Sequence, residues 1–203
     1  MKYFKALVCI IMVAVVLLLT SCTEQDPGYT VIVSSDGDEL LIDHHTESVV
    51  TLPYEYHQLY EGNLYTTSQN NDLANGAFRE TLIITPDSTI DVHFVIKIET
   101  EVEASYTLYE EATTSDDGTP EIIINKNRQS TNISAIVITY DPTITLDGTL
   151  LITEHWGTGK SRGGEERSEA EWILNHNTKY LLRVQNETTS DNYVSTVLLW
   201  YEH

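Results

Sequence analysis

The chain has 203 residues, and its 31 acidic against 11 basic residues give a formal net charge of −20 with 41% hydrophobic content. These figures predict one soluble domain of ordinary core size with a short appendage. So acidic a protein repels phosphate backbones, which excludes a nucleic-acid-binding role. No Gly-x-Ser-x-Gly elbow or other catalytic motif occurs, so we expect a protein that is not an enzyme and uses no cofactor.

Residues 1–21 are predicted to be a lipoprotein signal peptide. Lys2 and Lys5 precede an apolar run of 14 residues, which as a helix spans about 21 Å and is too short for a hydrocarbon core of roughly 30 Å. Leu19-Thr20-Ser21-Cys22 resembles the bacterial lipobox. The resemblance implies cleavage before Cys22 and stable membrane attachment through acyl chains on that residue. The alternative is an ordinary signal peptide with an incidental cysteine.

The two cysteines support the lipoprotein interpretation. Cys9 lies inside the leader, so the chain after Cys22 has no thiol for a disulfide, a metal or a nucleophile. All 31 acids but only nine basic residues follow Cys22, which gives that part a net charge of −22. Residues 22–28 are predicted to be a polar tether and residues 29–203 a single β-sandwich domain. The expected location is the bacterial envelope, at the outer membrane or cell surface, with the virion as the alternative.

The chain from Tyr29 onward has the pattern of successive strands. Alternating apolar and polar residues predict a long strand over 90–99 and an antiparallel neighbour over 101–108. Further strands are expected at 29–34, 38–43, 47–52, 81–85, 121–125, 133–140, 148–156, 178–186 and 193–202. Roughly ten strands predict an all-β, antiparallel β-sandwich or jelly-roll-like fold, preceded by the signal helix. After the leader the only helix candidate is 165–173, and no internal repeat is visible.

A glycine-rich loop is expected at 157–164. Its Gly159-Lys160-Ser161 resembles a phosphate-binding loop, but Glu154 stands where that motif needs glycine. We therefore expect a flexible loop that holds Lys160 and Arg162, with Arg167 just beyond it. These basic residues should pair with acidic residues, either within the chain or across a subunit boundary.

Metal binding is not expected. The seven histidines lack zinc-type spacing. Asp116 and Asp117 are weak calcium candidates, because hard cations prefer carboxylates in loops, but acidic turns usually remain solvated. A cluster of tyrosines (Tyr54, Tyr56, Tyr60 and Tyr65) either stacks on sugar or a partner's loop, or packs over the sandwich.

Three blocks carry a resemblance to a family. They are Tyr56 to Asn63, with its His-x-x-x-Glu-Gly pattern; the run from Gly159 through Leu174 with 177–180; and the ending Trp200-Tyr201-Glu202-His203. Together they resemble small virion-associated, structural-type proteins of tailed phages and prophages over about residues 30–203. The resemblance implies a β-sandwich building block without a known active site. The lipoprotein leader departs from that family.

The C-terminal strand is apolar on both faces, whereas a half-exposed strand has one polar face. One face carries Val194, Leu198 and Trp200, and the other Val197, Leu199 and Tyr201. One face should form core while the other meets a loop or another subunit, so Trp200 and Tyr201 are interaction candidates. We expect self-association as a trimer or dimer; in the alternative, residues 53–80 cover the second face within one chain.

These observations favour a non-enzymatic, phage-related module that acts through protein–protein contacts and is displayed through acylated Cys22. One alternative is a virion structural or decoration protein. Another is a cell-surface lipoprotein that binds glycan or calcium.

Overall fold

The computed structural model describes residues 29–33, 39–43, 48–49, 53–156 and 171–203, and the chain divides into two compact units, 1–52 and 53–203. In the first unit β1 (Tyr29–Val33), β2 (Glu39–Asp43) and β3 (Ser48–Val49) form an antiparallel three-stranded sheet. All three lie within predicted strands. They pair only with one another among the described residues, so the domain predicted from residue 29 is divided at residue 52.

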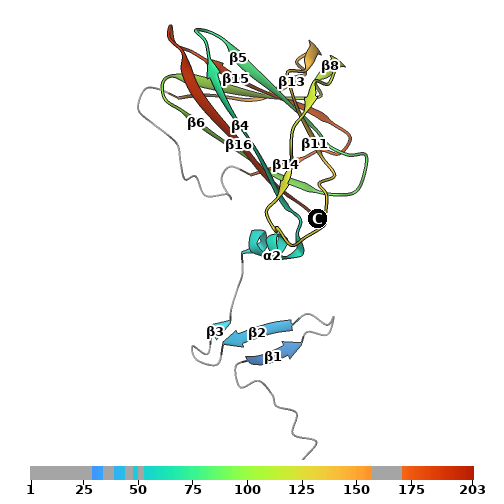
Figure 1. Cartoon of the computed structure of the whole chain (residues 1–203). Helices are drawn as coiled ribbons and strands as arrows, with labels where there is room; N and C mark the ends of the chain where they lie inside the picture. Colours follow the sequence, from blue (N-terminus) through green and yellow to red (C-terminus); the bar gives the residue numbers. More distant parts are fainter. Residues whose placement is uncertain (1–28, 34–38, 44–47, 50–52, 157–170) are drawn as a thin grey trace, which may run out of the picture. The chain divides into compact units, whose positions relative to one another are not determined.

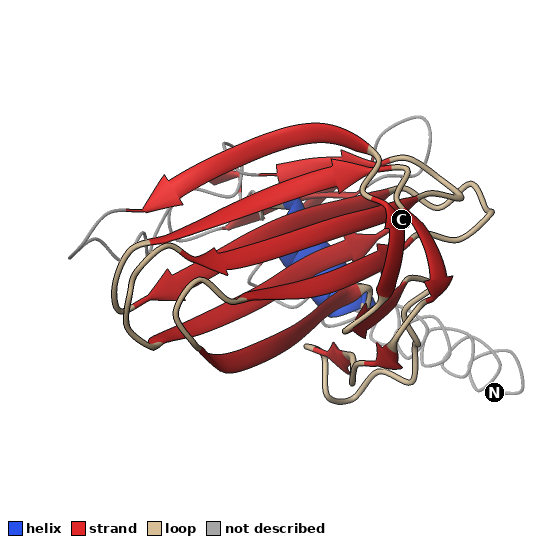
Figure 2. Cartoon of the chain, turned by 90° about the horizontal axis from the view of Figure 1, so that it is seen from above, coloured by secondary structure: helices blue, strands red, loops and turns tan. Residues whose placement is uncertain are grey.

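The second unit holds one helix and 13 strands in the described residues (Figures 1 and 2). The elements are α2 (Tyr54–Glu61), β4 (Leu64–Leu73), β5 (Phe78–Ile84), β6 (Val92–Thr100), β7 (Ala104–Glu110), β8 (Thr113–Asp116), β9 (Thr119–Pro120), β10 (Ile124–Asn125), β11 (Val137–Tyr140), β12 (Thr143–Leu146), β13 (Thr149–Trp156), β14 (Glu171–Leu174), β15 (Lys179–Asn186) and β16 (Asn192–Glu202).

Two antiparallel sheets pack face to face. One has the strand order β10-β4-β16-β6-β14 and the other β13-β7-β15-β5-β11-β9, with β8 and β12 as a separate pair. The inward residues of both sheets form one core, in which Trp200 is fully buried between the rings of Phe94 and Tyr65. The predicted all-β sandwich is confirmed.

Smaller apolar clusters cover part of each sheet's outer face. On the five-stranded sheet, Leu64, Leu199 and Tyr201 are buried with Leu59 of α2 packed against them. On the six-stranded sheet, Leu82, Ala112 and Leu181 are buried, with Ile144 of β12 against them. The second apolar face of β16 is thus partly covered within the chain, by a segment inside the 53–80 range.

The helix prediction was wrong in position. The part of 165–173 that the structure describes, from residue 171, lies in strand β14, which pairs with β6. The helix occurs at 54–61, between Pro53 and Gly62, whose φ of +77° is the left-handed conformation that ends helices. Strand β4 was missed because its sequence is polar; it is fixed by its place between β16 and β10.

Two ten-residue segments, 111–120 and 141–150, form a structural repeat that the sequence did not reveal. Each begins with a residue of positive φ (Glu111, Asp141) and contains an Asp-Gly-Thr turn whose glycine, Gly118 or Gly148, also has positive φ. The segments interlock, since β8 pairs with β12, β9 with β11 and β13 with β7. The expectation of no internal repeat therefore needs correction: few residues recur, but the backbone path does.

Candidate functional site

Three segments far apart in the sequence meet at one end of the sandwich, which we call the base. They are α2 with the following residues to Asn63, the loop 125–136, and the C-terminal residues 200–203; Figure 1 shows α2 beside the C-terminus. The first and last of these segments are two of the blocks that carry the resemblance. The structure therefore brings these two blocks together.

Asparagine side chains join loop 125–136 to the end of α2. The last carbonyls of a helix lack partners within it. Asn127 donates to the Tyr60 carbonyl at 3.0 Å, Asn132 to that of Glu61 at 3.2 Å, and Asn125 to that of Gly62 at 2.7 Å. These hydrogen bonds give the carbonyl groups at the end of α2 their partners and fix the loop against the helix.

Gly62 is required for this junction. Its positive φ disfavours other residues, and an added Cβ would overlap the side chain of Ser130. Inside the junction the buried Gln58 accepts a hydrogen bond from Asn63 at 3.1 Å. The Glu-Gly-Asn part of the first block thus has a structural explanation.

Glu202 ties the loop to the last strand. Its carboxylate, 7% exposed, accepts hydrogen bonds from Ser134 Oγ at 2.7 Å, from the Ala135 amide at 2.9 Å and from Trp200 Nε1 at 3.1 Å. No ion pair of Glu202 is found among the described residues, so these dipoles stabilise its charge. Burial, and secondarily the charge of Glu202, raise the pKa of Tyr65 to about 12.

Aromatic rings fill the space between α2 and the chain end. Tyr201 stacks on His93 with ring centroids 4.4 Å apart, and Tyr54 of α2 meets the edges of Tyr201 and His203 at 5.7 and 5.5 Å. His93 Nδ1 lies 3.1 Å from Glu171 of β14. The terminal Trp-Tyr-Glu-His motif therefore serves to assemble the base.

These placements correct two interaction candidates. Trp200 and Tyr201 are almost completely buried within the chain, so they are core residues and not a contact surface. The other candidates, Lys160, Arg162 and Arg167, lie outside the described residues.

The tyrosine cluster is divided by the structure. Tyr65 is buried in the core, whereas Tyr54, Tyr56 and Tyr60 on the eight-residue α2 remain 51%, 53% and 70% exposed. Tyr56 and Tyr60 are one helical turn apart and share a face. The base thus presents aromatic side chains of the kind that are enriched at protein interfaces.

Away from the base, a network of ion pairs centred on Arg183 lies on the outer face of the six-stranded sheet. Arg183 donates to Glu80 at 2.6 Å and to Asp147 at 2.9 Å, and lies near the rings of Phe78 and Tyr109. The hydrogen bonds from Arg183 hold the pKa of Asp147 below its usual range. This network anchors one Asp-Gly turn of the structural repeat.

The calcium candidates have structural partners. Asp117 forms a 2.5 Å ion pair with Lys179 and accepts a hydrogen bond from Thr114, and these bonds lower its pKa. Asp116 accepts from the Gly118 amide at 2.8 Å. A cation at Asp117 would have to displace Lys179, which makes this turn a poor calcium site.

A cleft of about 440 Å³ lies beside the same lysine. Glu111, Asn177 and Thr178 line it together with Lys179, which is already held by Asp117. The cleft is open to solvent, and its lining residues show no nucleophile–base pair.

Within residues 53–156 and 171–203 no group of three or more histidine, cysteine or carboxylate side chains is arranged to hold a metal ion. Among the helices that the structure describes, none is long and apolar enough to cross a membrane.

Sequence reasoning missed the base because its parts are about 70 residues apart along the chain. Pro53 and Gly62 around a short segment were the available signal for α2. Comparisons of the chain with family models and with curated proteins found no match.

Proposed function

We propose that this protein is a non-enzymatic β-sandwich module that acts through protein–protein contacts and is displayed on the bacterial envelope through acylated Cys22. The observation that carries the contact role is the exposure of three tyrosines on α2, at a base that is otherwise tightly bonded. The lipobox-like sequence before Cys22 supports the display. The resemblance to virion-associated proteins supports a phage origin for the module.

The tyrosines are suited to contact with a protein because their positions are fixed before binding. Asparagine side chains hold the end of α2, and Leu59 packs on the buried Leu64, Leu199 and Tyr201. A rigid aromatic side chain loses little conformational entropy when it is buried by a partner. The base therefore offers pre-organised anchors for a partner's surface.

Cys22→Ala should abolish membrane attachment. After expression of the full chain in a bacterium, we expect wild type to enter the detergent-rich phase of a phase-separation assay and the variant to leave it, because the acyl chains supply the membrane affinity. Cys9→Ala, in the apolar run of the leader, is the matched control and should partition like wild type. An intact mass that shows an unmodified Met1 or a cut elsewhere without acylation would refute the display.

A photo-reactive residue in place of Tyr60 should form discrete cross-links to protein in cells, because that side chain is the most exposed of the three tyrosines. The same residue in place of Glu99, which is exposed on β6, is the control and should give at least several-fold less adduct. Equal labelling at both positions, or adducts without protein mass, would argue against a contact at the base.

A further inference from the structure

A second surface, which shares the loop 125–136 with the base and continues onto β10 and β11, has the composition of an interface. From Pro120 to Arg128 exposure alternates residue by residue, so that Ile123 packs against the core while Ile122 points outward with 77% exposure. Ile133, in the loop that leads back to β11, is 89% exposed. We call this surface the basic strip; its members are Ile122, Ile124, Lys126, Arg128, Ile133 and Val137, all of them exposed.

The strip is set apart by its charge. Of the six basic residues that the structure describes, Arg79, Lys179 and Arg183 each pair with a carboxylate, whereas Lys97 of β6 and the strip's Lys126 and Arg128 form no ion pair within the described residues. Lys126 and Arg128 lie two positions apart, so the strip gathers two of these three cations. Two free cations beside exposed isoleucines are unexpected on a chain whose part after Cys22 carries −22. Such a patch is complementary to an acidic surface with an apolar centre.

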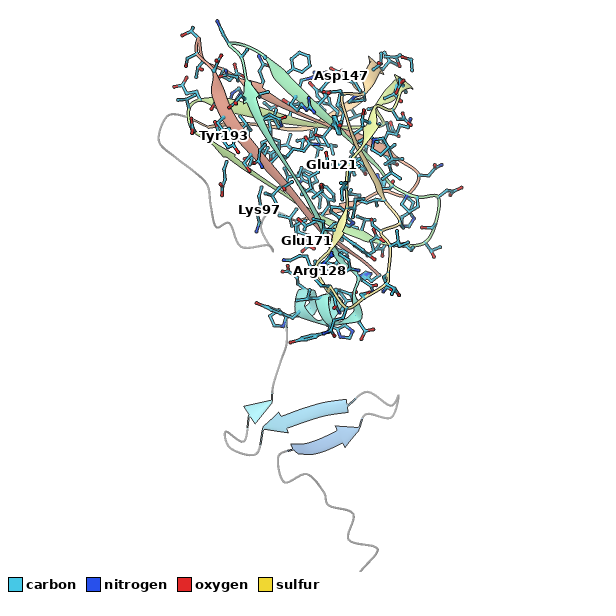
Figure 3. The ribbon with its side chains drawn as sticks, in the orientation of Figure 1. Lys97, Glu121, Arg128, Asp147, Glu171 and Tyr193 are labelled. Carbon is cyan, nitrogen blue, oxygen red and sulfur yellow. The ribbon has the colours of Figure 1, made fainter. Side chains whose placement is uncertain are left out.

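The same molecule carries a surface of that kind. Strand β9 lies at one edge of the six-stranded sheet and leads into the strip, and β13 lies at the opposite edge. Near β13, Leu146 and Leu150 are exposed together with Glu111, and the carboxylate of Asp147, which is bound by Arg183, is 41% exposed. We call these four residues the acidic edge. Figure 3 shows Arg128 beside α2, whereas Asp147 lies in a different part of the sandwich.

We propose that the basic strip of one copy docks on the acidic edge of a second copy. Strip-to-strip contact would bring the cations of both copies together, so the charges favour a head-to-tail arrangement. Contacts between two different surfaces either close into a ring or continue as a filament. The proposal rests on the contact role given above and names one partner, this chain itself.

Two double variants test the two surfaces separately. Ile122→Glu with Ile133→Glu adds charge to the strip, and Leu146→Lys with Leu150→Lys reverses the character of the edge; all four side chains are exposed, so the fold should be retained. Light scattering of the full processed chain in mild detergent, with the detergent mass subtracted, measures the protein mass at tens of micromolar. We expect an oligomer for wild type and a monomer for each variant.

An equimolar mixture of the two variants provides the decisive measurement. Each variant keeps one intact surface, so a head-to-tail contact predicts a one-to-one dimer that grows no further. Tyr193→Glu, an exposed aromatic position on β16 outside both surfaces, is the matched control and should remain oligomeric. Lys126→Glu alone should weaken association at least tenfold at low salt and less at high salt.

The outcomes separate this inference from the proposed function. A wild type that is monomeric at tens of micromolar overturns self-association, while cross-links at Tyr60 would still support contact with another protein. An oligomer that survives in both variants, a control that dissociates, or a mixture that stays monomeric overturns the head-to-tail docking. If only the Tyr60 cross-links fail, the proposed contact through the tyrosines of α2 is refuted and the head-to-tail docking is not.

Discussion

Glu202→Ala is expected to lower the free energy of unfolding by about 4 kcal/mol, one of the two largest effects predicted for a single substitution in this chain. The change removes the acceptor of the Ala135 amide and the shorter hydrogen bonds of the Ser134 hydroxyl and the Trp200 indole, which keep only partners at 3.3 Å. Hydrogen bonds to a charged group each contribute about 1.5–3 kcal/mol, and a buried donor without a partner is costly. Urea unfolding followed by tryptophan fluorescence measures the change.

Two further variants define the cause. Glu202→Gln keeps the shape but presents an NH₂ group where an acceptor is needed, so we expect a smaller loss of about 2 kcal/mol. Glu61→Ala, an exposed acid at the same base, should change stability by less than about 0.5 kcal/mol. If Glu202→Ala and Glu61→Ala had equal effects, the buried carboxylate would not hold the loop 134–136.

Gly148→Ala is expected to cost at least about 3 kcal/mol, because two penalties act together. The backbone at Gly148 has a φ of +93°, and an added Cβ would overlap the backbone carbonyl of Glu110. Backbone cannot move aside as a flexible side chain can. Gly118→Ala should behave similarly, since its Cβ would overlap the carbonyl of Tyr140 in the other segment of the repeat.

Gly76→Ala separates the two penalties. Gly76 also has a positive φ, +65°, but nothing lies within 4 Å of an added Cβ. It should therefore lose only the conformational part, about 1 kcal/mol. Chemical denaturation of the three variants under one condition gives the comparison. Equal losses at Gly76 and Gly148 would mean that the close approach between the interlocked segments does not matter for stability.

The sequence by itself determined the fold class and most of the long strands. Alternation of apolar and polar residues predicted β6 and β7, because in each of these strands one face meets the core and the other is more exposed. Further strand candidates between turn signals matched β13, β15 and β16. Period-two burial is a local pattern, so it is visible in a single sequence. The same reasoning recognised that β16 is apolar on both faces.

Tertiary structure alone decided where the polar and short elements lie. Strand β4 has a polar sequence and is held by pairing with β16. Residues 171–173, predicted as the end of a helix, lie in strand β14 because β6 offers a free edge. Which segment covers the second apolar face of β16 was also decided by packing, because α2, which covers part of it, lies more than 130 residues earlier in the chain. Local propensity is weak against such long-range contacts.

The candidate sites show the same division. Residue type was enough to select Asp117 and the terminal motif as notable, but their roles follow from distant partners. Lys179 neutralises Asp117 across 62 positions, and Glu202 binds a loop about 66 positions earlier. The interlocked repeat at 111–120 and 141–150 is also a property of backbone contacts, with few shared residues to reveal it. A sequence shows which groups can donate, accept or carry charge, but only the packed sheets determine which of them meet.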